Sequence, residues 1–526
     1  MSFGSLAAVP AAPRTAADLP VRPQVVTPVP LDSLVRTADA TLLRPARAHD
    51  DNPGVTGVTV DSRAVQPGDI YAALRGANVH GARFCADAAA AGAVAVLTDE
   101  AGAPSATASG VPALVVADPR GCLGPVSALV YGYPAQALTL VAITGTSGKT
   151  TTAHLVEAGV AASGLTAARI GTTGTAVDGT PLVSRLTTPE APELQALFAL
   201  MRERAVDTCA MEVSSHSLVL GRVDGVVFDV AAFTNLGRDH LDFHADEEDY
   251  FAAKAQLFTP QRSRRAVVNV DDESGRRIVA TRALPVRTVS AAGAPADWRC
   301  RDAKADRTGT AFTAEGPDSR LHSCRVRLPG AFNVANALLA IAACTEAGLP
   351  VDPVVDAIAD LRSVPGRMES VDEGQDFTVV VDYAHKPDAL TAVLDQLRAV
   401  TPGRLLVVLG AGGDRDTGKR AVMGELAARL ADLVVITDDN PRSEDPAAIR
   451  AALLDGTGAA PPAERAHVLE VADRAQAIEA ALAAARAGDC VLVAGKGHEQ
   501  GQHMDGRSEP FDDRVVARAA LSRRST

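Results

Sequence analysis

A glycine-rich stretch at residues 144–151, Thr-Gly-Thr-Ser-Gly-Lys-Thr-Thr, constrains the fold of this chain more than any other feature. It follows an apolar run at residues 138–143 that predicts a buried strand, and it precedes residues 153–162, which predict a helix. A strand, a glycine-rich turn and a helix together form a cradle for nucleotide phosphates, because the free N–H groups at the helix N-terminus point at them. The stretch therefore predicts an α/β nucleotide-binding domain.

Each residue type in this phosphate loop, residues 144–151, has an expected role. Lys149 would meet the β- and γ-phosphates, and the Thr150 hydroxyl would face Mg²⁺. The loop residues expected to contact the nucleotide are Gly145, Thr146, Ser147, Gly148, Lys149, Thr150 and Thr151. The commonest loop pattern has a glycine where this chain has Ile143, so the loop is shorter than usual. An ordinary glycine-rich turn is the alternative, but it does not explain Gly-Lys-Thr directly after a buried strand.

Composition bounds the class of protein. A chain of 526 residues has room for about three domains. The net charge of −13 argues against a general nucleic-acid binder, whose surface must neutralise phosphates. The seven cysteines form no C-x-x-C pair, so neither a disulfide framework nor a cysteine-rich zinc site is indicated, and a reducing, cytoplasmic setting fits. No apolar run has the length of a membrane span.

Alternation of apolar runs with helical patterns predicts the domain organisation. Residues 1–27 are rich in Ala and Pro and are expected to be a disordered lead-in. A small α/β domain is expected at 28–137 and a central domain with a mostly parallel sheet at 138–363. Residues 364–526 repeat the alternation, with strands expected at 378–381, 405–409, 433–436 and 491–493, and predict a second, doubly wound sheet.

Polar residues cluster where two central strands are expected to end. Glu212 closes the strand expected at 206–213, and His240 follows the strand expected at 226–234. Because ligands gather at the carboxyl ends of parallel strands, both side chains are candidate ligands for Mg²⁺ beside Thr150. Taken alone, either residue could be a helix cap. Lys254 lies in a helical pattern at 250–258, whose plain interpretation is an amphipathic helix with one solvated lysine.

The motifs together resemble the Mur ligase family over nearly the whole chain beyond the lead-in. They include the short phosphate loop, Thr187-Thr188-Pro189, residues 212–216, residues 235–244, residues 382–387 and residues 495–499. The resemblance implies an α/β enzyme of three domains: a small N-terminal UDP-binding domain, a central phosphate-loop ATPase domain and a C-terminal Rossmann-like domain that binds an amino acid. We expect a monomer.

The resemblance also implies roles for individual residues. Asn336, Arg367 and Asp382 match ATP-contacting positions, and Lys254 matches a lysine that is carbamylated in the family and helps to hold a second Mg²⁺. Lys149, Glu212, His240 and Lys254 would be the catalytic group, and Thr150, Glu212, His240 and carbamylated Lys254 the metal ligands. Positions matching those that hold a UDP-N-acetylmuramoyl-dipeptide are Ser62, Ala77, Asn78, Val79, Thr187, Thr188, Ser214, Arg222 and Lys254.

The amino acid to be added is indicated by the C-terminal domain. Asp439-Asn440-Pro441-Arg442 matches the form associated with meso-diaminopimelate. A guanidinium can hold the second carboxylate of that amino acid with two parallel hydrogen bonds, which makes Arg415 and Arg442 candidate clamps. Gly495 and Glu499 match positions that grip the distal group, with Glu499 suited to an ammonium.

The implied reaction joins meso-diaminopimelate to UDP-N-acetylmuramoyl-L-alanyl-D-glutamate. ATP would phosphorylate the terminal carboxylate, and the amine would attack the acyl phosphate. Within the same superfamily, a lysine-adding ligase, a dipeptide-adding ligase and a folylpolyglutamate synthetase remain alternatives. A catalytically silent nucleotide-binding regulator is an alternative of another class, although all four of Lys149, Glu212, His240 and Lys254 are present.

Overall fold

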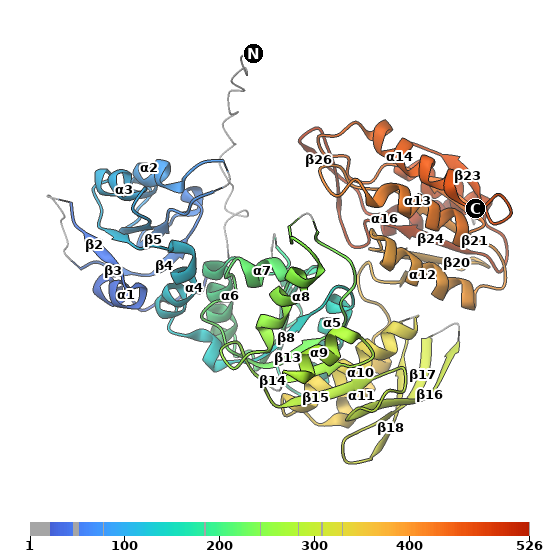
Figure 1. The fold of residues 1–526 in the computed structure, drawn as a ribbon, viewed down its shortest axis with the longest axis horizontal. Helices are drawn as coiled ribbons and strands as arrows, with labels where there is room; N and C mark the ends of the chain where they lie inside the picture. The colour runs from blue at the N-terminus through green and yellow to red at the C-terminus, as the bar shows by residue number, and fades with distance from the viewer. Residues whose placement is uncertain are drawn as a thin grey trace. The chain divides into compact units, whose positions relative to one another are not determined.

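The computed structural model describes residues 21–45, 52–76, 78–182, 186–241, 243–281, 283–306, 309–328 and 330–524. The chain divides into two compact units. Unit 1 comprises Met1–Leu140, Thr166–Cys209 and Val213–Phe228, and unit 2 comprises Val141–Leu165, Ala210–Glu212 and Asp229–Thr526. Strands and helices alternate along the chain in Figure 1, which confirms the α/β prediction.

The N-terminal sheet lies in unit 1 and has the strand order β2-β7-β6-β5-β4. Its strands are β2 (Thr41–Leu43), β4 (Gly57–Thr59), β5 (Asp69–Ala72), β6 (Ala95–Thr98) and β7 (Ala113–Val115). β4 to β7 pair in parallel, and β2 runs antiparallel to β7. The helices of this region are α1 (Leu31–Ala38), α2 (Cys85–Ala90), α3 (Ala103–Ala108) and α4 (Pro119–Val130), and β1 (Val29–Pro30) pairs with β3 (Gly54–Val55).

Residues 21–27 belong to the expected disordered lead-in but form hydrogen bonds within unit 1. The Arg22 guanidinium donates two hydrogen bonds to the Asp69 carboxylate, at 2.5 and 2.8 Å. The backbone N–H groups of Gln24 and Val25 donate to the Glu203 carboxylate at 3.0 and 2.9 Å. These residues are therefore held in unit 1 by charge-assisted hydrogen bonds that composition does not reveal. The rest of the expected lead-in, residues 1–20, lies outside the described residues.

The central sheet carries the phosphate loop. Its strand order among the described residues is β11-β10-β9-β12-β8-β13-β14-β15-β16-β17-β18. The strands are β8 (Thr139–Thr144), β9 (Ala167–Gly171), β10 (Gly174–Val177), β11 (Thr180–Leu182), β12 (Thr208–Glu212), β13 (Phe228–Phe233), β14 (Ser263–Asn269), β15 (Val286–Ser290), β16 (Trp298–Asp306), β17 (Gly309–Glu315) and β18 (Leu321–Val326). β8 and β13 pair in parallel, whereas β16, β17 and β18 are antiparallel. The buried apolar run of β8, from Leu140 to Ile143, explains why this strand is central.

Helices follow most of these strands. They are α5 (Lys149–Ala162), α6 (Ala191–Glu203), α7 (Ser215–Val219), α8 (Glu247–Ala255), α9 (Glu273–Ala280), α10 (Ala331–Glu346) and α11 (Val351–Asp360). α5 begins at Lys149, four residues before the expected start, so the first turn of the helix belongs to the phosphate loop itself.

The C-terminal sheet is doubly wound, as predicted. Its order is β19-β20-β24-β21-β22-β23, and all pairs except β19 with β20 are parallel. The strands are β19 (Glu369–Ser370), β20 (Thr378–Asp382), β21 (Leu405–Leu409), β22 (Leu433–Ile436), β23 (His467–Glu470) and β24 (Cys490–Ala494). The helices are α12 (Pro387–Val400), α13 (Lys419–Leu430), α14 (Pro446–Ala459), α15 (Arg474–Ala484) and α16 (Asp513–Arg524), and β25 (Gly501–Met504) forms a hairpin with β26 (Arg507–Pro510).

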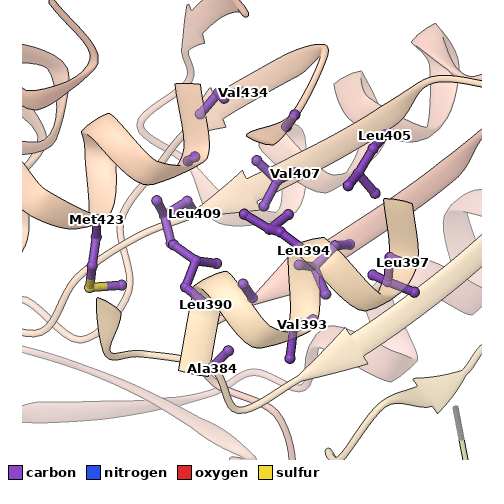
Figure 2. Packing of buried hydrophobic residues seen from close by; sticks show 14 of the residues in the cluster. Ala384, Leu390, Val393, Leu394, Leu397, Leu405, Val407, Leu409, Met423 and Val434 are labelled. Atoms are coloured by element: carbon purple, nitrogen blue, oxygen red, sulfur yellow. The ribbon is translucent and has the colours of Figure 1, made fainter. Parts of the chain in front are cut away.

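Alternate residues of the C-terminal strands form two cores, one on each face of the sheet. Val407 and Leu409 of β21 pack with residues of α12, α13 and α14. Leu406 and Val408 pack on the other face with residues of α15 and α16. Figure 2 shows the apolar stripe of α12, which includes Leu390 and Leu394, against β21. A strand buried on both faces explains the continuous apolar run of β21.

Within the described residues, no helix combines the length and the apolar character needed to cross a membrane.

Candidate active site

The phosphate loop has room only for glycine at two positions. Gly145 has φ 143° and Gly148 has φ 86°, a backbone conformation that favours glycine. A Cβ at Gly145 would lie 1.9 Å from Thr234 Oγ1, and one at Gly148 would lie 2.4 Å from Asn336 Oδ1. The close approach of Asn336, from α10, also places this predicted ATP-contacting residue beside the loop.

The residues after β13 hold the phosphate loop in shape. The Thr146 and Ser147 N–H groups donate to the backbone and side-chain oxygens of Asn235, at 2.9 and 3.0 Å. Thr234 Oγ1 donates to Ser147 O at 2.6 Å. Thr234 and Asn235 were not among the predicted site residues, because their contacts join segments almost 90 residues apart.

Two lysines converge on one carbonyl oxygen of the loop. Lys149 Nζ donates to Gly145 O at 2.8 Å and to Thr146 O at 3.0 Å, and Lys254 Nζ donates to Gly145 O at 3.0 Å. Burial lowers the pKa of Lys149 to about 8. Burial and the neighbouring Lys149 ammonium hold the pKa of Lys254 well below its usual value. Both cations therefore lie where phosphate oxygens would compensate them.

Lys254 is buried, which contradicts the interpretation of α8 as a helix with a solvated lysine. Its side chain is 1% exposed, and Nζ lies 4.6 Å from the centre of the Tyr250 ring. The Tyr250 hydroxyl is 3.1 Å from Thr146 Oγ1. Residues one turn apart on α8 thus both face the loop, and a depressed pKa leaves Lys254 with a larger fraction of neutral amine than a solvated lysine has.

The predicted metal ligands are distributed around the loop. Glu212, at the end of β12, is 1% exposed, and Thr150 is buried in the first turn of α5. The Glu212 carboxylate is close enough to oppose the fall of the Lys149 pKa. His240 has φ 54°, and its Nε2 lies 3.0 Å from Asp239 Oδ2. No group of three or more His, Cys, Asp or Glu residues in the described part of the chain is arranged to hold a metal.

Asp239 is a carboxylate, 10% exposed, that the sequence did not single out. It pairs with His240 and with Lys386, which stands at the N-cap of α12. Burial alone would raise the pKa of Asp239, but the hydrogen bond to His240 and the Lys386 ammonium hold it far below its usual range. His240 is thus already oriented by an anion.

Two of the predicted ATP-contacting residues are Arg367, which reaches the phosphate loop, and Asp382, which ends β20. Arg367 Nη2 donates to Thr150 Oγ1 at 3.1 Å, and its guanidinium lies 4.6 Å from the centre of the Tyr383 ring. The Asp382 carboxylate accepts the N–H groups of Met368 and Ala384, both at 2.7 Å. Burial raises the pKa of Asp382, although the Arg367 charge opposes the rise. Asp382 therefore fixes the backbone next to Arg367.

Four of the residues predicted to hold the muramoyl-dipeptide lie in unit 1: Thr187, Thr188, Ser214 and Arg222. Ser214 N donates to Thr188 Oγ1 at 3.3 Å, and Arg222 Nη1 donates to Thr188 O at 3.2 Å. The Thr187 hydroxyl is 3.3 Å from that of Thr172. Arg222 also pairs with Glu190 at 2.9 Å, a partner that was not predicted.

The residues predicted to meet UDP lie on surface segments of the same unit. Ser62 begins a short 3-10 helix capped by Asp61, and Asn78 and Val79 are exposed. Ala77 lies outside the described residues.

The predicted diaminopimelate residues gather at the carboxyl ends of β21, β22 and β24. A Cβ at Gly412 would lie 3.1 Å from Arg442 Nη1 and 4.0 Å from Arg415 Cγ, so both arginines approach one loop. Asn440 Nδ2 donates to Glu499 Oε2 at 2.7 Å.

A close approach also joins Gly495 to Asp439. A Cβ at Gly495 would lie 2.5 Å from Asp439 Oδ2. Lys496, beside Gly495, is fully buried and was missed, although its place in a glycine-rich loop after a strand is a signal that could have found it.

The class of the protein follows from the phosphate loop, the two lysines that converge on it, and the buried oxygen donors of Thr150 and Glu212. The fold and the site are those of an α/β phosphate-loop nucleotide-binding protein.

Comparison with known families narrows that class. The Mur ligase middle domain matches residues 143–344, the Mur ligase glutamate ligase domain matches 366–497, and the Mur ligase family catalytic domain matches 54–131. A protein of Streptomyces avermitilis named UDP-N-acetylmuramoyl-L-alanyl-D-glutamate–2,6-diaminopimelate ligase is 55% identical, over 95% of this chain and 98% of its own length. A UDP-N-acetylmuramyl-tripeptide synthetase of Leifsonia xyli is 46% identical, over 90% and 92%. The chain belongs to the Mur ligase family.

Solved structures agree with this assignment. A structure titled UDP-N-acetylmuramoyl-L-alanyl-D-glutamate–2,6-diaminopimelate ligase superposes with a TM-score of 0.66 at 31% identity, covering 95% of this chain and all of the other. A MurF ligase from Thermotoga maritima in complex with ADP gives a TM-score of 0.63 at 18% identity, covering 89% of this chain and 99% of the other, which shows the shared fold alone.

Proposed function

We propose that this protein is an ATP-dependent, ADP-forming ligase that joins meso-diaminopimelate to UDP-N-acetylmuramoyl-L-alanyl-D-glutamate through an amide bond. The observation that carries the proposal is the extent of the similarity to diaminopimelate ligases, up to 55% identity over nearly the full length of both chains. A lysine-adding ligase is the alternative, since the name of the Leifsonia relative does not specify the added amino acid.

ATP is expected to bind with its phosphates on the first turn of α5. Lys149 Nζ donates to Gly145 O, so a bound γ-phosphate offers this ammonium group a better acceptor than a neutral carbonyl. Arg367 already reaches Thr150 and brings a second positive charge to the loop. Charge stabilisation and positioning are the main means by which proteins catalyse phosphoryl transfer.

Mg²⁺ fits the donors beside the loop. A buried carboxylate on Glu212 and a buried hydroxyl on Thr150 are hard oxygen donors, and Mg²⁺ usually takes few protein ligands together with water and phosphate oxygens. We propose that Thr150, Glu212, His240 and carbamylated Lys254 hold the metal ions. When bound, Mg²⁺ would neutralise charge on the transferred phosphoryl group.

The buried amine supports the proposed carbamylation of Lys254. A neutral lysine amine adds to CO₂, forming a carbamate and releasing one proton. The depressed pKa of Lys254 favours the neutral amine, and the change from cation to anion would remove the repulsion from Lys149. The same side chain would then be able to bind a metal ion.

The amide forms in two proposed steps. The γ-carboxylate of the D-glutamyl residue attacks the γ-phosphorus of ATP, giving an acyl phosphate and ADP. The amine of diaminopimelate then attacks the acyl carbon, and inorganic phosphate leaves from the tetrahedral intermediate as the amine loses a proton. Thr188, Ser214 and Arg222 would hold and orient the dipeptide for this reaction.

Recognition of the amino acid is assigned to the C-terminal loops. Arg415 and Arg442 would hold the distal carboxylate, and Glu499 would hold the distal ammonium. Gly495, Asp439 and Asn440 would complete the same site. The three-domain boundaries, the cytoplasmic location and the monomeric state remain predictions.

The test is a phosphate-release assay with UDP-N-acetylmuramoyl-L-alanyl-D-glutamate, in which diaminopimelate, lysine and ornithine are offered in parallel. We expect ATP-dependent phosphate release and a new amide with diaminopimelate. Preferential use of lysine would favour the alternative ligase. ATP turnover that no amino acid stimulates would favour a nucleotide-binding regulator.

A further inference from the structure

A buried lysine lies at the centre of the predicted amino-acid site. Lys496 follows β24 and is fully buried. Its Nζ donates to Asn440 Oδ1 at 2.9 Å, to Glu499 Oε2 at 3.1 Å and to Gly501 O at 2.7 Å. An ammonium has three N–H donors, so all three have a partner within the protein.

Lys496 fixes the side-chain amide of Asn440. Asn440 Oδ1 accepts from Lys496 and from the His503 N–H at 3.0 Å, which leaves Nδ2 to donate to Glu499 Oε2 at 2.7 Å. The lysine and the His503 N–H together determine which way the amide points.

The same contacts give the two carboxylate oxygens of Glu499 different hydrogen-bond partners. Oε2 accepts from both Lys496 and Asn440, while the side chain remains 30% exposed. Among the described residues, Oε1 has no hydrogen-bond partner, so it is the oxygen available to a ligand. A bound ammonium would meet an anion whose charge is already partly compensated by Lys496.

Arg442 differs from Lys496 in how few of its N–H donors are used within the described part of the protein. The Arg442 guanidinium makes one hydrogen bond within the described residues, to Gly413 O at 2.5 Å. The remaining N–H groups of the guanidinium are available for a carboxylate. A distal carboxylate on the ligand would therefore bind the Arg442 guanidinium. A distal ammonium without a carboxylate would bind only Glu499, whose charge Lys496 already partly compensates.

We propose that Lys496 is a positioning residue that fixes Asn440 and Glu499 and makes the site select a distal end carrying a carboxylate over one carrying an ammonium alone. This inference rests on the proposed function and adds to it the determinant of selectivity. A lysine that only filled space in the core would affect stability without changing which amine is used.

The first experiment uses the wild-type enzyme and two amines that share the reacting end of diaminopimelate. Lysine keeps only the distal ammonium, and 2-aminopimelate keeps only the distal carboxylate. We expect kcat/KM for 2-aminopimelate to exceed that for lysine by at least about tenfold. Equal or better use of lysine would overturn the selectivity argument without any variant.

The second experiment replaces the ammonium with a neutral amide, Lys496→Gln. We expect KM for diaminopimelate to rise by at least about tenfold, KM for ATP to stay within about twofold, and the preference for diaminopimelate over lysine to fall by at least about tenfold. Glu499, left without its internal cation, would attract a lone ammonium more strongly.

Arg404→Gln is the matched control, because Arg404 bonds Asp489 at the opposite end of β24. It should leave the preference between amines unchanged. A folded Lys496→Gln enzyme with unaltered selectivity refutes the inference alone, whereas a wild-type enzyme that forms no amide with diaminopimelate refutes the proposed function as well. If Lys496→Gln does not fold, the wild-type comparison of the two amines decides.

Discussion

Replacing Lys149 with methionine should abolish activity and at the same time stabilise the nucleotide-free protein. The lysine is held at the loop by two carbonyl oxygens while burial depresses its pKa from 10.5 to about 8. Such a shift means that the folded state disfavours the charged form. The charged Lys149 side chain therefore lowers the free energy of unfolding of the nucleotide-free protein. Bound phosphates would compensate this charge.

The size of the expected stability change follows from the lowered pKa of Lys149. A difference of about 2.5 pKa units corresponds to about 3 kcal/mol. Methionine would remove this penalty and lose two hydrogen bonds worth about 1 kcal/mol each, which leaves a net gain of about 1 kcal/mol at pH 7. Because the folded pKa is the lower one, the penalty is complete below about pH 8 and fades as the pH rises toward 10.5. By pH 9.5 it is about 1 kcal/mol, and the advantage of methionine is gone.

The assay is urea denaturation of both proteins without nucleotide at pH 7.0 and pH 9.5, beside a measurement of amide formation. Lys304→Met, at an exposed position of β16, is the control and should change the free energy of unfolding by less than about 0.5 kcal/mol. A Lys149→Met protein that is less stable at pH 7.0, or that differs from the wild type equally at both pH values, would refute the reasoning. Retained amide formation would remove Lys149 from the mechanism.

Three further outcomes are expected. Lys254→Ala should lose nearly all amide formation and regain part of it with an added short carboxylate; an active variant that such a carboxylate does not affect would contradict carbamylation. Arg442→Ala should raise KM for diaminopimelate by at least about tenfold while KM for ATP stays constant, and equal effects on both would count against the clamp. Asp513→Asn should lower the free energy of unfolding by about 3–5 kcal/mol in urea denaturation, because it leaves the fully buried Arg474 without its anion, whereas Asp513→Leu combined with Arg474→Met should be nearly neutral.

Strands buried on both faces are the elements that the sequence predicts best. β21 and β22 match the expected ranges residue for residue, because a central parallel strand carries an unbroken apolar run. β16 to β18 were not expected. β16 is mostly exposed and polar, and its partner strands are selected by antiparallel pairing rather than by a local apolar pattern.

The residues of the site also differ in how well the sequence predicts them. The phosphate loop could be predicted because Gly145, Gly148 and Lys149 act within a few residues of one another. The contacts of Lys254 with Gly145 and of Lys496 with Asn440 span 109 and 56 residues, so the sequence does not show these contacts, and only the glycine-rich loop around Lys496 gives a local signal. Family resemblance supplied Lys254, whereas the helical pattern alone favoured a solvated side chain.

The ion pair between Arg22 and Asp69 bears on how the protein can be shortened. Asp69 lies on β5 and is 1% exposed, and among the described residues it forms an ion pair with Arg22, in the segment expected from its composition to be a disordered lead-in. A chain starting at residue 28 would keep every strand of the N-terminal sheet and still leave a buried carboxylate uncompensated, at a cost of several kcal/mol. Trimming to the first regular element would therefore yield a weaker protein than trimming to residue 21.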